Sequence, residues 1–237
     1  MRDLVNVMWK EIAEFLGNQR SLRVFGVAVL IMGVLPTLTG RTTAVGDVAA
    51  LRMAIEALYV LFAAAIVVAN TAPDLVLHER VGRTLEYLIA TRLPDSAIFG
   101  GKVLVSAAVG YVAALVAIAL QLVANAVLAG HGFSWLYLAL PEGRILALGL
   151  TADLALYLAV VGTFVALRVG DQRGAYLVTI LSLGVVIAPF LLGWVHIALT
   201  TAWFAHAAEV FGAVALLLGG LGVLLFRREM LVLYLQE

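Results

Sequence analysis

Long apolar runs, separated by short polar and charged stretches, make up most of the sequence. A helix needs about 20 mainly apolar residues to cross the hydrocarbon core of a membrane. Six runs approach this length and predict membrane crossings. They cover approximately residues 24–40, 53–72, 103–130, 145–167, 174–188 and 210–226. The pattern therefore predicts an all-α polytopic membrane protein, in which residues 1–237 form a single transmembrane domain.

Prolines and glycines modify two of these crossings. Pro36 lies near the end of the first run, where we expect a kink. The uncharged stretch 174–208 is too long for one crossing, and Pro189 and Gly193 interrupt it. We therefore expect the fifth crossing to end near Ala188 and a re-entrant segment to precede the sixth crossing.

The first 23 residues predict an amphipathic helix. Leu4, Met8 and Ile12 recur at helical spacing, and the charged residues fall on the opposite side. Such a helix lies in the plane of the membrane surface, where Trp9 would sit at headgroup depth. We expect it to end near Gly17. The segment has no uninterrupted apolar core of the kind that a signal peptide needs.

Composition supports the membrane class and excludes others. Mean hydropathy is +1.08 and 64% of residues are hydrophobic, against roughly 45–50% in soluble domains. The chain has no cysteine, which excludes disulfides and thiol catalysis. The formal charge of +0, without a basic tail, gives no sign of nucleic-acid binding. No H-E-x-x-H or G-x-S-x-G motif indicates an enzyme.

Basic residues predict the orientation. With six crossings, one side of the membrane receives Arg2, Lys10, Arg20, Arg23, Arg80, Arg83, Arg92, Lys102, Arg168, Arg173, Arg227 and Arg228. The other side receives only Arg41, Arg52 and Arg144. Because cytoplasmic loops carry the excess of Lys and Arg, both termini are predicted to be cytoplasmic, in a cell membrane.

Residues 74–102 form the longest charged segment. Its apolar residues Leu77, Val81, Leu85 and Leu88 draw a stripe along one side of a helix, and its charged residues fall mostly off that stripe. Two interpretations fit this pattern. The helix either rests on the lipid headgroups or presents its charges to a soluble partner.

The same segment, HERVGRTLEYLIATRLPDSAIFGGK, resembles the first cytoplasmic loop of the permease subunit of type-2 ATP-binding-cassette exporters. The matching residues are Glu79, Arg80, Thr84, Leu85, Glu86, Leu88, Thr91, Asp95, Gly101 and Lys102. The later LRVGDQRGAYLV, residues 167–178, is similar to the second cytoplasmic loop of that family. The layout of the whole chain fits as well, including the amphipathic N-terminal helix.

The resemblance implies a transport subunit rather than an enzyme. A coupling helix in the first loop would dock on a cytoplasmic ATPase, and a second permease copy, identical or related, would complete the translocation path. The residues implied in coupling are Glu79, Arg80, Arg83, Thr84, Leu85, Glu86, Leu88, Arg168, Asp171 and Arg173. The resemblance also implies a prokaryotic membrane, contact with lipids and export as the direction of transport.

The chain has no phosphate-binding loop of its own. The triplet 100–102 lacks the upstream glycine spacing and the hydroxyl of G-x-x-x-x-G-K-[ST]. We therefore expect ATP and Mg on the partner chain and no cofactor or metal in this one. Lys102 is instead interpreted as the start of a helix, with its ammonium reaching back to the membrane surface.

Four polar residues inside the predicted crossings are candidates for the substrate path. Asp153 is central in its crossing, where a charge costs about 2.5–3.5 kcal/mol on insertion scales. It either pairs with Gln121 or Asn125 on the third crossing, or handles substrate or protons. Glu56 follows Arg52 by one helical turn, which favours an ion pair.

His206 and Glu209 are three residues apart and could supply two metal ligands, but two ligands do not make a metal site.

The alternative function is a self-contained, ion-coupled transporter or channel that uses Asp153 and Glu56. Such transporters often contain two similar halves, and this sequence shows no repeat of one half in the other. The transported substrate is not identified by any residue.

Overall fold

The computed structural model describes six stretches of the chain. These are residues 2–39, 48–81, 93–128, 144–169, 171–196 and 201–225. Their fold is all-α, as predicted. Within these stretches lie α1 (Arg2–Gly17), α2 (Gln19–Thr39), α3 (Val48–Val81), α5 (Asp95–Leu128), the π-helix η2 (Ile145–Leu150), α8 (Thr151–Arg168), α9 (Gln172–His196) and α10 (Thr201–Leu225).

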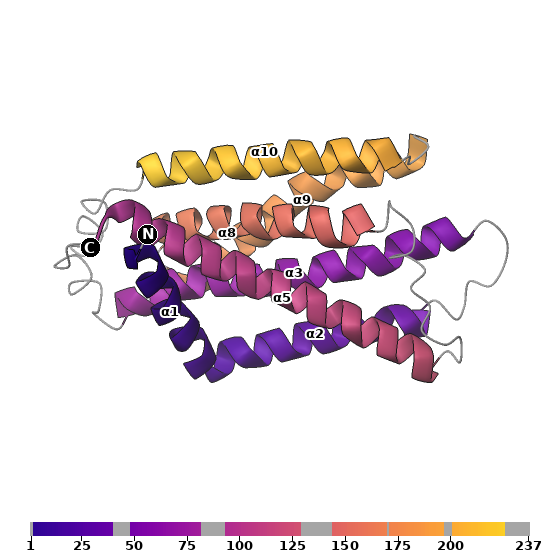
Figure 1. The fold of residues 1–237 in the computed structure, drawn as a ribbon, viewed down its shortest axis with the longest axis horizontal. Coiled ribbons are helices and arrows are strands. Elements are labelled where there is room, and N and C mark those ends of the chain that lie inside the picture. Colours follow the sequence, from indigo (N-terminus) through magenta and orange to yellow (C-terminus); the bar gives the residue numbers. More distant parts are fainter. Residues whose placement is uncertain are drawn as a thin grey trace.

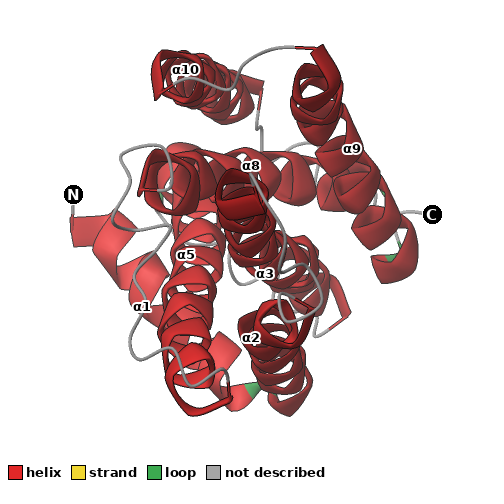
Figure 2. Ribbon diagram, turned by 90° about the vertical axis from the view of Figure 1, so that its right-hand side faces the viewer, coloured by secondary structure: helices red, strands yellow, loops and turns green. Residues whose placement is uncertain are grey.

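Helix α3 is the centre of the bundle. It packs against α2, α5, α8 and α9, and Figure 2 shows it between them. Its alanines are fully buried at Ala57, Ala63, Ala64, Ala65, Ala69 and Ala72. Small side chains let membrane helices approach closely. On the facing helix α5, a Cβ at Gly110 would come within 2.1 Å of Val68 Cγ2.

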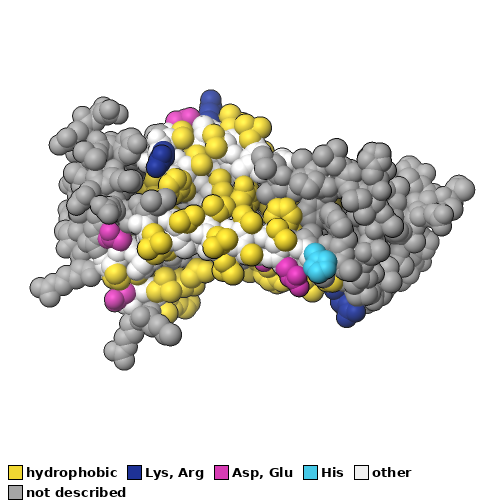
Figure 3. All heavy atoms as spheres, turned by 90° about the horizontal axis from the view of Figure 1, so that it is seen from above, with side chains coloured by type: hydrophobic (Ala, Val, Ile, Leu, Met, Phe, Trp, Pro, Cys, Tyr) yellow, Lys and Arg dark blue, Asp and Glu magenta, His cyan; other side chains and the backbone are white. Residues whose placement is uncertain are grey.

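Four of the described helices are long and apolar enough to cross a membrane. Their apolar stretches are Gln19–Leu38, Glu56–Glu79, Asp95–Leu128 and Ala147–Arg168, and a shorter one covers Ala208–Leu224. Figure 3 shows hydrophobic side chains over the middle of one face of the molecule and charged side chains around its edges. An apolar exterior of this kind is typical of a membrane protein.

Helices α3 and α5 are longer than a membrane is thick. Each has 34 residues, which at 1.5 Å per residue gives a length of about 51 Å. The hydrocarbon core is only about 30 Å thick. One end of each helix therefore extends beyond the hydrocarbon if the pair stands close to the membrane normal.

The predicted boundaries of the charged segment 74–102 need correction. The second crossing was expected to end near Ala72, but α3 continues through Pro73 to Val81. Its last turns stay helical because Val76 and Leu77 are buried against Ala166 and Ala175. Helix α5 in turn begins at Asp95, before the predicted start of the third crossing.

The break predicted at Pro189 and Gly193 is wrong. Helix α9 runs without interruption from Gln172 to His196, and α10 runs from Thr201 to Leu225 with Glu209 inside it. No separate re-entrant segment appears in these two stretches. Proline is tolerated inside membrane helices because neighbouring groups can satisfy the freed carbonyl, and the same holds for Pro36 within α2.

The N-terminal helix is confirmed, and it ends at Gly17 as predicted. Figure 1 shows α1 running across the end of the bundle, at a steep angle to the long helices. The side of α1 that faces the bundle carries Glu11, which is fully buried, between the buried apolar residues Val7 and Phe15. Val5, Trp9 and Leu16 face outward, since they are 50–66% exposed. This arrangement suits a helix at a membrane surface, with Trp9 turned away from the protein.

Candidate functional site

Five charged side chains meet where α1 crosses α3 and α5. Lys10, Glu11 and Glu14 come from α1, Glu79 comes from the last turn of α3, and Lys102 comes from the third turn of α5. We call these five residues the ion cluster. Since α3 and α5 flank residues 82–92, the cluster lies at the base of the predicted coupling loop.

Lys102 is the central cation of the ion cluster. Its Nζ lies 2.8 Å from Glu11 Oε1 and 2.9 Å from Glu79 Oε2, and it donates a hydrogen bond of 2.7 Å to the carbonyl of Leu75. The Lys102 side chain is 6% exposed. The interpretation of Lys102 as a lysine that reaches to the membrane surface is therefore wrong, because its ammonium is satisfied inside the protein.

The second cation, Lys10, lies at the edge of the ion cluster. Its Nζ binds Glu79 Oε1, and it lies 3.2 Å from Glu14 Oε1 and 3.6 Å from Glu11 Oε1. Burial lowers the pKa of Lys10, but the hydrogen bond to Glu79 and the charges of the three carboxylates outweigh it, so the pKa is raised. Lys10 is therefore charged at neutral pH.

A close backbone contact brings α1 to this position. A Cβ at Gly101 would come within 2.5 Å of Val7 Cγ1, so only glycine fits there without a shift of the neighbouring side chain. Val7 itself is 6% exposed. The glycine directly before Lys102 thus allows Glu11, one turn after Val7, to reach the ammonium.

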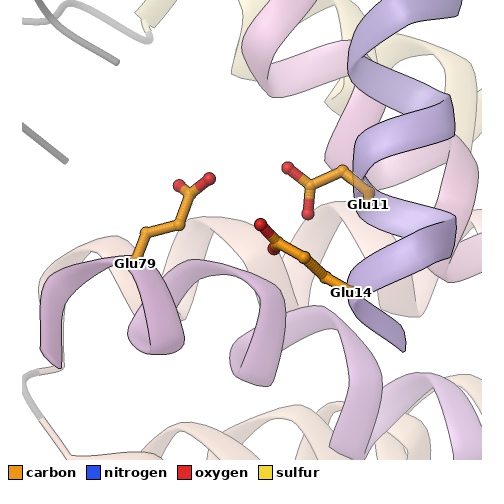
Figure 4. Close-up of side chains that lie close together, drawn as sticks. All are labelled: Glu11, Glu14 and Glu79. Carbon is orange, nitrogen blue, oxygen red and sulfur yellow. The ribbon is translucent and has the colours of Figure 1, made fainter. Parts of the chain in front are cut away.

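The ion cluster contains more acidic than basic side chains. Three carboxylates face two ammonium groups, and one oxygen from each carboxylate lies within 4.8 Å of the others. Figure 4 shows the side chains of Glu11, Glu14 and Glu79 converging from two helices. This spacing would suit a metal ion, but the two ammonium groups already bind the same carboxylates. The arrangement is therefore an internal ion-pair network.

A second polar junction lies nearby, around Asp74 on α3. Asp74 Oδ2 accepts hydrogen bonds from Asn18 Nδ2 at 2.8 Å and from Ser21 Oγ at 2.7 Å. Its Oδ1 accepts one from Gln172 Nε2 at 3.1 Å, and Arg20 Nη1 donates to Gln172 Oε1 at 2.9 Å. Asp74 thereby joins the α1–α2 corner, α3 and the start of α9.

The predicted second coupling loop lies at this same end of the bundle. Asp171 accepts hydrogen bonds from the backbone N–H groups of Gly174 at 2.7 Å and Arg173 at 2.9 Å, and so caps α9. These bonds lower the pKa of the exposed Asp171 carboxyl. Arg168 and Arg173 are exposed, and the guanidinium of Arg168 lies 5.0 Å from the centre of the Phe164 ring.

The other predicted coupling residues divide into two groups. Glu79 is 4% exposed and belongs to the ion cluster, so it faces the protein interior here. Arg80 belongs to α3. The remaining ones, Arg83, Thr84, Leu85, Glu86 and Leu88, lie outside the described residues.

Among the candidates for the substrate path, Asp153 does not pair with Gln121 or Asn125, which was one of its two predicted roles. Gln121 Nε2 donates to the carbonyl of Glu56 at 3.1 Å and to that of Met32 at 3.4 Å, so it joins α5 to α3 and α2. Asp153 instead faces α10, where a Cβ at Gly212 would lie 3.0 Å from Asp153 Oδ1. Asn125 is 1% exposed, and its Oδ1 has no hydrogen-bond donor among the described residues.

Glu56 is buried, and its backbone carbonyl accepts the bond from Gln121. Its predicted partner Arg52 belongs to α3. At the other end of the bundle, His206 Nδ1 and Glu209 Oε2 lie 3.3 Å apart, with side chains 77% and 74% exposed. This contact is a surface pair, as expected.

Sequence reasoning missed the ion cluster because it assigned the charges of residues 1–23 to water. One signal was present, since the pair Gly100-Gly101 directly before Lys102 offers a flat surface on which another helix can lie. No protein-family model matches the chain, and no curated protein matches it. The function is therefore argued from these residues and their geometry.

Proposed function

We propose that this chain is the transmembrane subunit of an ATP-driven exporter, coupled to a separate cytoplasmic ATPase through the segment that follows α3. ATP and Mg belong to that partner, and the chain itself carries out no catalysis. Two permease copies, identical or related, would form the translocation path. The six-crossing topology, cytoplasmic termini and prokaryotic cell membrane predicted from the sequence are part of this proposal.

One observation carries the proposal. Lys102 on α5 is bound between Glu79 on α3 and Glu11 on α1, at distances of 2.9 and 2.8 Å. The segment 82–92 follows the end of α3, two residues after Glu79, and precedes α5, which begins at Asp95, two helical turns before Lys102. A force applied to this segment would therefore reach two long membrane helices and the N-terminal helix together.

The ion cluster is suited to transmit such a force because separating its members is costly. Removing one partner of a buried ion pair leaves an uncompensated charge, which typically costs about 3–5 kcal/mol. Helices joined by ion pairs of this strength are expected to move together. The junction at Asp74 adds the start of α9, which follows the second predicted coupling loop, to the same end of the bundle.

Co-purification tests the proposal. The chain is expressed with its neighbouring genes, extracted in mild detergent and isolated by a tag. We expect a soluble ATPase to accompany it in stoichiometric amount, and the variant Arg83→Glu to lose that ATPase while still inserting in the membrane. The matched control is Arg144→Glu, a charge reversal at an exposed residue before η2.

The alternative, a self-contained ion-coupled transporter, gives the opposite result. A chain that purifies alone and moves a solute in proteoliposomes without ATP would contradict the exporter proposal. The position of Asp153 favours this alternative, because its half-buried carboxylate lies on α8 against Gly212 of α10. Glu56 would then be the second candidate for ion coupling.

A further inference from the structure

Two carboxylate oxygens in the ion cluster are buried without a partner. They are Glu11 Oε2 and Glu14 Oε2, and no described residue donates a hydrogen bond to either. Figure 4 shows the two carboxyl groups turned toward one another. Two ionised carboxylates in this position repel each other, and a buried oxygen that accepts no hydrogen bond costs about 1–3 kcal/mol or more when charged.

The net charge of the ion cluster indicates which kind of ion could bind to these two oxygens. Glu11, Glu14 and Glu79 contribute three negative charges when ionised, and Lys10 and Lys102 contribute two positive charges. The ionised cluster therefore has a net charge of minus one. One bound proton makes it neutral, whereas one divalent cation would leave it at plus one, beside two ammonium groups that repel it.

We propose that the ion cluster is a proton-binding site, in which Glu11 holds a proton on Oε2 at neutral pH. Glu11 Oε1 still accepts the hydrogen bond from Lys102, because a neutral carboxyl group keeps a carbonyl oxygen. The proton turns Oε2 from an acceptor without a partner into a donor, and the Glu14 carboxylate, one oxygen of which lies within 4.8 Å of an oxygen of Glu11, is near enough to be its acceptor. The proton comes from water, and no other bond forms or breaks.

Glu11 is the member of the ion cluster best placed to hold the proton. Its side chain is fully buried, whereas those of Glu14 and Lys10 are 33% and 39% exposed. Burial raises the pKa of Glu11 and nearby Glu79 raises it further, while Lys102 and Lys10 oppose the shift without reversing it. Glu79 binds both ammonium groups, those of Lys10 and Lys102.

The surroundings of the ion cluster contain two further titratable groups among the described residues. Asp74 and His78 on α3 line a small cavity together with Glu14. Asp74 accepts three hydrogen bonds, from Asn18, Ser21 and Gln172. The proposal concerns the protonation of Glu11 and does not depend on the exporter assignment.

Infrared spectroscopy of the purified full-length chain in lipid nanodiscs tests the proposal. The carbonyl stretch of a protonated carboxyl group is separated from that of a carboxylate. We expect the difference between wild type and Glu11→Gln at pH 7 to contain the protonated carboxyl band, and we expect this band to disappear as the pH is raised. Glu209→Gln is the matched control, because it removes an exposed carboxylate outside the ion cluster, and it is expected to keep the band.

Two results would overturn the proposal. The first is a wild-type spectrum at pH 7 without any protonated carboxyl band, a test that needs no variant. The second is Mn²⁺ binding to wild type that is lost in Glu11→Gln, because the site would then take a metal ion instead of a proton. If Glu11→Gln does not fold, Glu11→Asp serves in its place, and the band is expected to shift in position.

Discussion

Lys102 and Glu11 are 91 residues apart in the sequence, yet the Lys102 ammonium lies 2.8 Å from the Glu11 carboxyl group in the folded chain. Both side chains are almost completely buried, at 6% and 0% exposure. This contact fixes α1 on α5. An N-terminal helix that could have been a separate surface element is thereby part of the helical bundle.

The first prediction concerns Lys102→Met, which removes the central cation and keeps the length of the side chain. Glu11 and Glu79 then face each other inside the protein without the ammonium that binds both. We expect the free energy of unfolding to fall by roughly 3–5 kcal/mol, as when one partner of a buried ion pair is removed. Urea unfolding in detergent, followed by tryptophan fluorescence, measures it.

Lys10→Met is the matched control for this variant. Lys10 is 39% exposed, and Lys102 remains to compensate Glu79. The loss of stability is therefore expected to be smaller, at about 0–1 kcal/mol for a half-exposed pair. If the two variants lose the same amount of stability, Lys102 is not the main stabilising cation of the ion cluster.

The second prediction concerns Gly101→Ala. The added Cβ would lie 2.5 Å from Val7 Cγ1, so α1 must shift or Val7 must change its rotamer. We expect a destabilisation of about 1–3 kcal/mol, as for other overpacked contacts. Cleavage by a protease between α1 and α2 is expected to become faster, because α1 is less firmly attached.

A neighbouring glycine and a second substitution make this test specific. A Cβ at Gly100 would lie 3.7 Å from Leu4 Cδ1, an ordinary contact, so Gly100→Ala should leave the proteolysis rate unchanged. Adding Val7→Ala to Gly101→Ala removes the clashing methyl group and should restore most of the lost stability. Without this rescue, the contact between α1 and α5 is not the cause.

The third prediction uses the cap of α9. The pKa of Asp171 is lowered by the backbone N–H groups of Gly174 and Arg173. A lowered pKa means that the stabilisation is present above the unfolded value of about 3.9 and is lost as the pH falls through the folded value. Exchange of the Gly174 amide hydrogen should therefore lose protection only in acid.

Asp171→Asn is the variant that checks this assignment. An asparagine oxygen can still accept the two hydrogen bonds, but it does not titrate. Protection of the Gly174 amide, measured by NMR, should then be lower than in wild type at pH 7 and should not decrease further in acid. An acid-dependent loss that persists in Asp171→Asn would assign the titration to another group.

Much of the fold follows from composition alone, because the energy of a membrane-crossing helix is a sum over about 20 residues. The predicted crossings at 24–40, 103–130 and 145–167 therefore coincide with helical stretches of the structure. The ends of the helices were predicted less well. The second crossing was expected to end near Ala72 and the fifth near Ala188, but α3 and α9 both continue, and packing of buried residues such as Val76 keeps α3 helical beyond Pro73.

The ion cluster could not be predicted from the same reasoning. Charged residues at the two ends of a membrane protein are expected to face water, and periodicity alone does not tell which side of α1 meets the bundle. That choice depends on a contact between Val7 and Gly101, which are far apart in the sequence. The surroundings of Asp153 could not be predicted for the same reason. Its carboxylate lies against Gly212 of α10, whereas the sequence suggested a partner on the third crossing.

The last prediction concerns Asp153→Asn, which removes the charge inside α8 and keeps the shape of the side chain. Asp153 is only half-buried and asparagine has nearly the same size, so folding and assembly should change little. We expect substrate-stimulated ATPase activity of the complex to fall about tenfold, the factor that roughly 1.4 kcal/mol of lost interaction produces. Size-exclusion chromatography measures assembly in the same samples.

Glu209→Gln is the control for Asp153→Asn, because it removes an exposed carboxylate whose partner among the described residues is His206 at the surface. It should leave both activity and assembly unchanged. If Asp153→Asn prevents assembly, the carboxylate has a structural partner across α10, and Gly212→Ala, which would crowd Asp153 Oδ1 at 3.0 Å, should cause the same defect. If activity falls while assembly is intact, the charge at Asp153 acts on the transported substrate or on a proton that moves with it.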